Sequence, residues 1–280
     1  MLVPMKTVLD WAEHKGCAAA AFDTPNLELL LAAIGAAEAR CEPVIIQHAQ
    51  LHETETSLDV IGPIMVARAR AASVPVCVML DHGEDVEYVR RALEIGFSAI
   101  MYDGSQDSYE ENLRVTREVV ALCHARGVDV EAEIGFTTGH EGLEEADDSR
   151  ENIYTDPACA QRFVADTGID ALAASVGTVH GFYKAAPCLD FERIAKLKAC
   201  CGVPLVMHGG SGLSREDTRA AIAAGIRKIN YFSYMSNAGV RAVEALLATQ
   251  HPKYFHTLAA AATQAMQADA QAAMETFSMH

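Results

Sequence analysis

Residues 74–105 read VPVCVMLDHGEDVEYVRRALEIGFSAIMYDGS, and they contain one complete strand–helix–strand unit. The apolar run 74–81 predicts a buried strand, and the run 98–105 predicts a second one. Between them, 85–96 has helical spacing, begins at an Asp and ends at a Gly, which is the usual capping asymmetry. Two strands joined through a helix are typical of a parallel sheet.

The same alternation runs along the whole chain. Because the apolar runs are nearly continuous, they indicate parallel strands that are buried on both faces. The expected strands are 18–23, 43–49, 74–81, 98–105, 129–135, 170–177, 203–210 and 226–233, and the clearest helices between them are 26–40, 85–96, 110–127 and 214–225. Eight strand–helix units predict a (β/α)8 TIM barrel, with an open doubly wound sheet as the alternative.

The remaining segments fit one barrel domain over residues 1–280. Residues 5–16 predict an extra N-terminal helix before the first strand, and the tail from about residue 256 predicts an extra C-terminal helix. No linker or low-complexity tract interrupts the sequence. A chain of 280 residues is of ordinary size for such a barrel.

The charge and hydropathy of the chain limit the kinds of partner that it is expected to bind. The formal net charge is −16, which argues against nucleic acid and anionic membranes as partners. No apolar run reaches the roughly 18 residues of a membrane span, and the amphipathic start of the chain is unlike a signal peptide. We therefore expect a cytoplasmic protein whose eight cysteines stay reduced.

In such a barrel the chemistry lies at the carboxyl ends of the strands, so the residues there are the first candidates. Three histidines, His82, His180 and His208, follow three different strands, and Glu131 and Glu133 end a fourth. A lone histidine in this position is more often a hydrogen-bonded structural residue. Three on one rim favour a catalytic Zn2+ site with an open coordination position. The other histidines of helices, loops and tails are interpreted as surface residues: His14, His52, His124, His251, His256 and His280.

Asp81 directly precedes His82. Adjacent residues of a strand point to opposite faces, so only a bend at the strand end lets both side chains approach the rim. The favoured role for Asp81 is a general acid/base beside the metal. The alternative is a carboxylate that orients a metal ligand.

A glycine-rich turn, HGGSG at 208–212, joins the seventh strand to a helix. Backbone N–H groups of such a turn can hold an anion, and the loops after strands seven and eight form a recurrent phosphate site in these barrels. The eighth strand ends with Asn230 and Ser233, which adds polar groups to the same place. A phosphate site built from amides and hydroxyls is compatible with an acidic chain.

Over nearly its whole length the chain resembles the class II, zinc-dependent fructose-/tagatose-bisphosphate aldolase family. The segments that carry the resemblance, in this order, are LDHGEDVEYVRRALEIGFSAIMYDGS (80–105), VEAEIG (130–135), GTVHGFYK (177–184), PLVMHGGSGL (204–213) and KINYFS (228–233). The resemblance implies an enzyme that cleaves a ketose 1,6-bisphosphate or ketose 1-phosphate reversibly to dihydroxyacetone phosphate and an aldehyde.

The resemblance also implies a role for each matching residue. Asp81 is the acid/base on the substrate hydroxyl, and Glu141, in the loop FTTGHEGLEEADD (136–148), moves the C3 proton of dihydroxyacetone phosphate. The zinc ligands are His82, His180 and His208, with Glu133 as an alternate ligand. The phosphate is held by Gly181, Gly209, Gly210, Ser211, Asn230 and Ser233. A monovalent cation near the phosphate and a homodimer or homotetramer are further implications.

The chain departs from the family pattern in places that bear on the substrate. The first strand ends in Asp23, where the family usually has Asn, and the second offers His48 and Ala49 instead of a serine. The residues after Asn230 are bulky, and the tail after residue 266 has no Lys or Arg. A second phosphate normally needs a basic clamp, so we expect that the aldehyde half is not phosphorylated or is held elsewhere.

Two other functions stay open at this stage. A zinc hydrolase of the amidohydrolase type would carry H-x-H on its first strand, and AAAAFD at 18–23 has none. A non-catalytic sugar-phosphate-binding homologue would be expected to have lost some of the required groups, whereas all are present. The alanine-rich last helix could be an oligomer interface or could pack on its own barrel.

Overall fold

Eight parallel strands form a closed barrel, with each strand hydrogen-bonded to its neighbours in chain order and β8 paired with β1. This arrangement comes from a computed structural model in which residues 1–135, 154–183 and 187–279 are described. The strands are β1 (Ala19–Asp23), β2 (Val44–Ala49), β3 (Val76–Gly83), β4 (Ala99–Tyr102), β5 (Asp129–Ile134), β6 (Ala171–Ala174), β7 (Leu205–Met207) and β8 (Ile226–Tyr231). The predicted (β/α)8 barrel is confirmed, and the open sheet is excluded.

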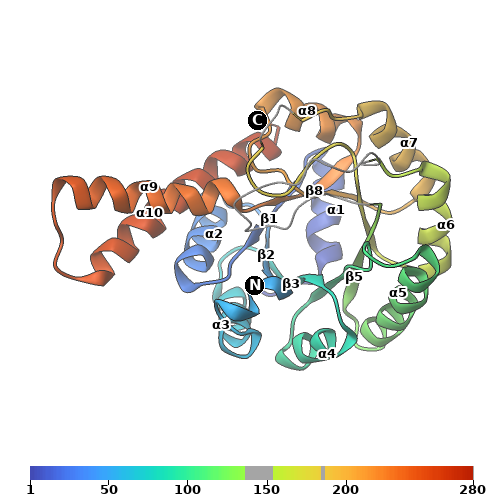
Figure 1. The fold of residues 1–280 in the computed structure, drawn as a ribbon, viewed down its shortest axis with the longest axis horizontal. Coiled ribbons are helices and arrows are strands. Elements are labelled where there is room, and N and C mark those ends of the chain that lie inside the picture. Colours follow the sequence, from blue (N-terminus) through green and yellow to red (C-terminus); the bar gives the residue numbers. More distant parts are fainter. Residues whose placement is uncertain (136–153, 184–186, 280) are drawn as a thin grey trace.

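Most of the helices form a ring around the barrel (Figure 1). The helices are α1 (Met5–Lys15), α2 (Leu27–Arg40), α3 (Leu58–Ala71), α4 (Val86–Ile95), α5 (Tyr109–His124), α6 (Pro157–Thr167), α7 (Phe191–Cys201), α8 (Arg215–Ala224), α9 (Ser233–Thr249) and α10 (Phe255–Phe277), with a short 3-10 helix η1 (Gln50–Thr54) after β2. Among them, α1 lies at one end of the barrel and α9 extends away from it. Several helices begin at the residue type that the sequence favours there. Asn26, Asp85 and Ser214, for example, each accept a hydrogen bond from the first turn of the helix that follows.

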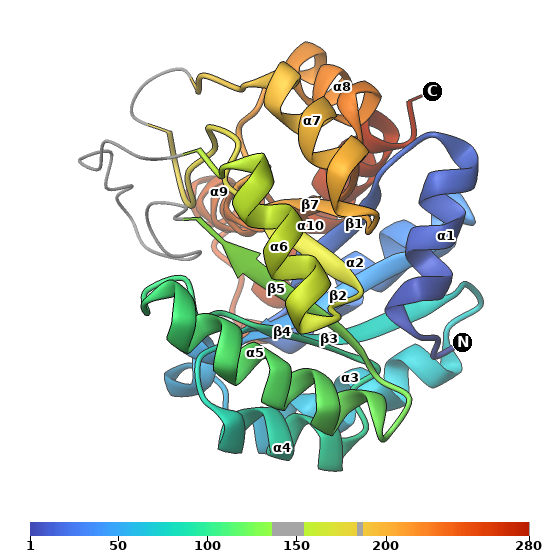
Figure 2. The same cartoon turned by 90° about the vertical axis from the view of Figure 1, so that its right-hand side faces the viewer.

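The core has two parts that follow the alternation of the strands. Outward-facing side chains pack under the helices, whereas inward-facing ones such as Ala19, Ile45, Met79 and Val206 fill the barrel. The extra helix α1 was predicted, and its buried face joins the inner cluster at one end of the barrel (Figure 2). That end is closed, so the opposite end, where the strands finish, is the one available for a site.

The predicted C-terminal helix is α10, which forms an antiparallel hairpin with α9 that extends away from the barrel (Figure 1). In the last part of α10, one face is buried against the barrel; it consists of Met266, Ala270, Ala273, Met274 and Phe277. The start of α10 lies near the tip of the hairpin and carries exposed aromatic side chains, Tyr254 and Phe255. Within the described residues, no helix has both the length and the apolar character that a membrane span requires.

Candidate metal centre

The end of β3 is a β-bulge that turns two adjacent side chains toward the mouth of the barrel. Leu80 pairs with Ile100 on β4, but the next pair is Gly83 with Tyr102, so β3 carries one extra residue at Asp81 and His82. His82 has φ of 40°, an uncommon backbone conformation for a residue other than glycine. Asp81 continues the inward-facing row, and the bulge brings the His82 ring to the same side.

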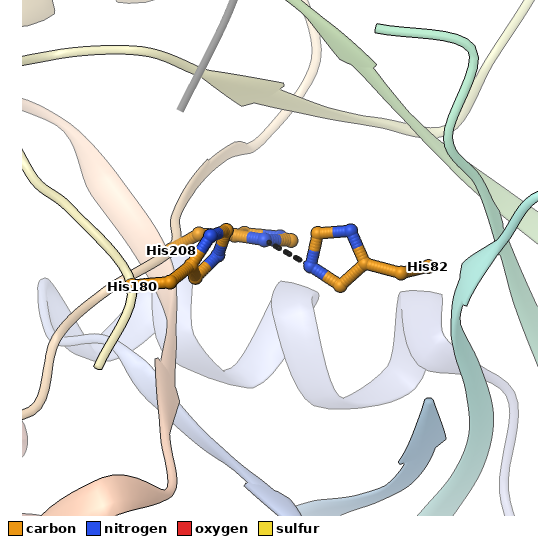
Figure 3. A group of neighbouring side chains, drawn as sticks. All are labelled: His82, His180 and His208. Carbon is orange, nitrogen blue, oxygen red and sulfur yellow. Dashed lines mark hydrogen bonds between the residues drawn. The ribbon is translucent and has the colours of Figure 1, made fainter. Parts of the chain in front are cut away.

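Three histidines meet above the inner core, and each is almost fully buried. In Figure 3, His82 approaches from one side, while His180 and His208 approach from the other. Their potential ligand atoms lie within 4.8 Å of one another. Nδ1 of His208 is 3.0 Å from Nε2 of His82. Two nitrogens bound to one tetrahedral Zn2+ at 2.0–2.1 Å would be about 3.3 Å apart, so this spacing fits the metal.

Asp103 contacts the ring nitrogen of His82 that points away from His208. A carboxylate oxygen of Asp103 lies 2.6 Å from Nδ1 of His82, which leaves Nε2 directed toward His208. Carboxylate–histidine pairs of this kind fix the orientation of metal ligands. Burial alone would lower the pKa of His82, but the carboxylates of Asp81 and Asp103 outweigh it and raise the pKa to about 10. Any metal ion held by this ring would therefore have to displace a proton from it.

Two glutamates of β5 face His208 from opposite sides. Oε1 of Glu131 lies 3.0 Å from Nε2 of His208, and Oε2 of Glu133 lies 4.0 Å from its Nδ1. Glu133 is therefore on the side of the ring that faces His82, where an alternate metal ligand would have to be. Glu131 is on the far side and also contacts Lys228 of β8, whose Nζ lies 2.8 Å from Oε2.

Asp81 is held by two amides. Nε2 of Gln47 donates to Oδ1 of Asp81 at 2.7 Å, and Nδ2 of Asn230 lies 3.3 Å from the same oxygen. The other oxygen, Oδ2, is 3.7 Å from Nε2 of His82. A buried carboxylate is thus fixed beside the nitrogens that can bind a metal, in a position suited to proton transfer next to that ion.

The glycine-rich turn after β7 lies tightly against its neighbours. Gly209 has φ of 66°, and a side chain there would collide with the carbonyl of Val179. The Gly210 N–H donates to the carbonyl of Asn230, so this amide is already used. Ser211 Oγ accepts from the Phe232 N–H at 3.0 Å, which leaves its hydroxyl hydrogen available to a ligand.

The first turn of α9 faces this turn across the Ser211–Phe232 hydrogen bond. Ser233 is its first residue, and no side chain in the described part of the chain caps this helix, whereas Ser214 caps α8. Uncapped N–H groups at a helix start are suited to bind an anion. Gly181, with φ of 84°, directly follows His180.

Comparison with known proteins agrees with this geometry. The family model described as "Fructose-bisphosphate aldolase class-II" matches residues 3–280. The chain belongs to the class II fructose-bisphosphate aldolase family. It is an aldolase, an enzyme that makes and breaks carbon–carbon bonds.

Individual relatives support the assignment. The fructose-bisphosphate aldolase of Geobacillus stearothermophilus is 38% identical over 254 residues, which are 88% of this chain and 86% of the relative. The Escherichia coli K12 protein YdjI is 39% identical over 233 residues, 83% of each chain. The crystal structure of the YdjI aldolase superposes with a TM-score of 0.88 at 35% identity, covering 99% of this aldolase and 97% of YdjI.

The structure brings together most of the residues that the sequence predicted for the site of this aldolase. The three histidines, Asp81, Glu133 and Asn230 surround one small volume at the mouth, and the glycine turn lies beside it. Glu141 lies outside the described residues, as does His280. The interpretation of His52 as a surface residue is wrong, because its side chain is only 4% exposed and its ring packs on Phe232.

Sequence reasoning missed three supporting residues of the aldolase site. Gln47 and Lys228 lie within strands, and Asp103 follows β4. Lys184, the basic residue nearest the site in sequence, is outside the described residues, whereas Lys228 reaches Glu131 inside the barrel. Inward-facing polar residues at every second position of a strand are the signal that could have found Gln47 and Lys228.

His48 on β2 gives the aldolase a measurable acid sensitivity. Its side chain is fully buried, neither ring nitrogen has a hydrogen-bond partner in the described part of the chain, and burial lowers its pKa to about 4. In the unfolded chain the pKa is about 6.5, so the unfolded state binds a proton first as the pH falls. The contribution of His48 is therefore complete above pH 6.5 and decreases toward pH 4, by about 2 kcal/mol at pH 5.

We compare the change in the free energy of unfolding between pH 7 and pH 5. For His48→Phe we expect this change to be less destabilising than for the wild type by about 2 kcal/mol. Urea unfolding at both pH values measures this difference. His14→Phe is the matched control, because His14 is exposed on α1 and its replacement should leave the pH dependence of the wild type unchanged. Parallel pH curves for His48→Phe and the wild type would contradict the assignment of a neutral buried His48.

Proposed function

We propose that the chain is a zinc-dependent aldolase that cleaves a ketose 1-phosphate or a ketose 1,6-bisphosphate to dihydroxyacetone phosphate and an aldehyde. The observation that carries the proposal is the position of Asp81. Its carboxylate lies 3.7 Å from the His82 nitrogen that faces the other two histidines. A proton-transfer group and a Lewis-acid site are thus adjacent, which is what reversible aldol cleavage requires.

The residues present suit zinc. His82, His180 and His208 would hold the ion through neutral imidazole nitrogens, and Glu133 would serve as an alternate ligand. When bound, zinc polarises the ketone oxygen of the substrate and stabilises the negative charge that develops as the C3–C4 bond breaks. Burial of the cluster excludes water, which strengthens these interactions.

Asp81 would move the proton of the C4 hydroxyl. In cleavage it accepts this proton while the C3–C4 bond breaks, and in the synthetic direction it returns the proton to the new alkoxide. The amides of Gln47 and Asn230 hold the carboxylate in one orientation, so little reorganisation is needed. Glu141 is proposed as the group that exchanges the C3 proton of dihydroxyacetone phosphate.

The phosphate would bind where the glycine turn meets the start of α9. The Ser211 hydroxyl and the uncapped first turn beginning at Ser233 are the available donors there, with Gly181 and Gly209 allowing close approach of the backbone. Gly210 contributes by holding the turn against Asn230, since its own N–H is used in that bond.

We propose further that the aldehyde half of the substrate carries no phosphate. Asp23, at the end of β1, is fully buried and in register with Gln47, which donates to Asp81. Asp23 therefore places a carboxylate beside the residue that holds Asp81, close to where the carbon–carbon bond would be cleaved. Hydroxyl groups are better partners than a phosphate for such a surface.

A coupled assay for dihydroxyacetone phosphate tests the function. The panel is fructose and tagatose 1,6-bisphosphates, fructose 1-phosphate and other ketose 1-phosphates, each with zinc and with chelator. We expect zinc-dependent release, fastest from a ketose 1-phosphate. Preference for a bisphosphate would contradict the proposal about the aldehyde half, and no zinc-dependent release from any of them would overturn the function.

We also propose that the enzyme is a homodimer or homotetramer and acts in the cytoplasm. The exposed Tyr254 and Phe255 of the hairpin, which are 67% and 78% exposed, support association through its tip. All eight cysteines are free thiols, as expected for a reducing compartment. Sedimentation velocity of the purified chain gives the oligomeric state, and a monomer at micromolar concentration would contradict it.

A further inference from the structure

Lys228 lies inside the barrel, beneath the histidine cluster. Its ammonium nitrogen is 2.8 Å from one carboxylate oxygen of Glu131 and 3.1 Å from the other, and neither side chain is exposed to solvent. Ala19 is the register partner of Lys228, and Ala171 is the register partner of Glu131. Because these inward-facing neighbours are small, they leave room for both long side chains. A buried ion pair is a costly way to fill a core, since apolar residues of similar volume would often be as stable.

Among the described residues, a hydrogen bond between Glu131 and His208 links the pair to the histidine cluster. Oε1 of Glu131 is 3.0 Å from Nε2 of His208. A carboxylate can only accept here, so Nε2 carries the hydrogen and the lone pair of His208 is on Nδ1. Nδ1 is the nitrogen that lies 3.0 Å from Nε2 of His82 and faces Glu133.

A carboxylate also orients His82, but it contacts Nδ1 of this ring, whereas in His208 it contacts Nε2. Asp103 lies against its Nδ1, which leaves Nε2 as the nitrogen directed toward His208. The two rings thus present Nε2 of His82 and Nδ1 of His208 to the same point, each because a carboxylate holds the other nitrogen. Asp103 has the Ser105 N–H as a further partner, whereas Glu131 has the Lys228 ammonium.

We propose that Lys228 and Glu131 are positioning residues for the metal. Lys228 holds the Glu131 carboxylate in place, and Glu131 holds His208 with Nδ1 toward the ion. This inference rests on the proposed zinc site but not on the substrate or the reaction. Its test is therefore a binding measurement, which can succeed or fail independently of turnover.

The experiment is a zinc titration against a chromophoric chelator for the wild type, Glu131→Gln, Lys228→Met and the double variant. We expect each single substitution to weaken zinc binding by about 10- to 100-fold, the range seen for residues that support metal ligands. The double variant should bind zinc no more weakly than the weaker single variant, because both residues act through one hydrogen bond. Thermal unfolding without metal establishes that each variant is folded.

A matched control comes from the outer surface of the barrel. Lys198 forms an ion pair with Glu13 at 2.7 Å, far from the cluster in the fold, and Lys198→Met should leave zinc affinity unchanged. A second readout is the nitrogen chemical shift of His208 in the zinc-loaded protein, where we expect the metal on Nδ1 and the hydrogen on Nε2. If Lys228→Met does not fold, Glu131→Gln and this spectrum still decide the matter.

Unchanged zinc affinity in both single variants, losses that multiply in the double variant, or a metal on Nε2 of His208 would each overturn the inference. Failure of the wild type to bind zinc would instead remove the proposed metal site on which the inference depends. Zinc binding by the wild type without aldol cleavage would remove the proposed function and leave the positioning role intact.

Discussion

Asp81→Ala should lower kcat for cleavage by about 10²- to 10⁴-fold, the usual contribution of a positioned acid/base group. The carboxylate is the group beside the cluster that Gln47 and Asn230 orient, and alanine leaves those two amides without their acceptor. Zinc should still bind, because the three imidazoles are intact. The measurements are kcat in the coupled assay and zinc content of the same preparation.

Glu84→Gln is the matched control for Asp81→Ala. Glu84 is an exposed carboxylate three residues further along, outside the bulge, and its loss should leave kcat within about twofold of the wild type. Full activity in Asp81→Ala would show that another group transfers the C4 proton. Loss of zinc together with activity would mean that Asp81 acts through the metal site instead.

His180→Ala should remove both zinc and turnover. The His180 ring lies 5.2 Å from the His82 ring and 5.6 Å from that of His208, centroid to centroid, and it completes the three-histidine set. Replacing a residue that supports a metal ligand typically weakens metal binding by about 10- to 100-fold. Removing a ligand itself should therefore weaken it by more than about 100-fold. Chelator competition measures the affinity, and activity should fall in parallel at limiting zinc.

His14→Ala makes the same chemical change at an exposed position on α1, at the closed end of the barrel. It should affect neither zinc affinity nor kcat. Tight zinc binding by His180→Ala would place the ion among other side chains, for example the grouping of His82, Asp103 and Glu133, whose ligand atoms also lie within 4.8 Å of one another.

Much of the fold was predictable because buried parallel strands leave a strong apolar signal. All eight strands were found, but several predicted ends extend too far, as in 203–210 for β7, which ends at Met207. The residues beyond Met207 belong to the turn that begins with His208 and Gly209. The positive φ of Gly209 takes the chain out of the sheet. Apolar and small residues continue through that turn, so the sequence pattern has no break there.

The site was predictable where residue types are diagnostic and unpredictable where tertiary packing decides. Histidines at three strand ends point to a metal from sequence alone. A lysine in a strand suggests a solvent-exposed position, and only the register of β8 against β7 and β1 places Lys228 inside the barrel. His52 could not be recognised as buried, because η1 follows a loop course that the sequence pattern does not specify.

The bulge at the end of β3 has a consequence for how the enzyme behaves on warming. Asp81 and His82 are neighbours in the chain, so their Cα atoms are separated by one peptide unit of about 3.8 Å. Loops and helices around a barrel shift by ångströms as thermal motion increases, and catalytic groups carried on separate elements drift apart with them. Here a covalent link joins the proposed proton acceptor to a proposed metal ligand and fixes the separation of their Cα atoms. That separation should therefore survive fluctuations that loosen the rest of the mouth.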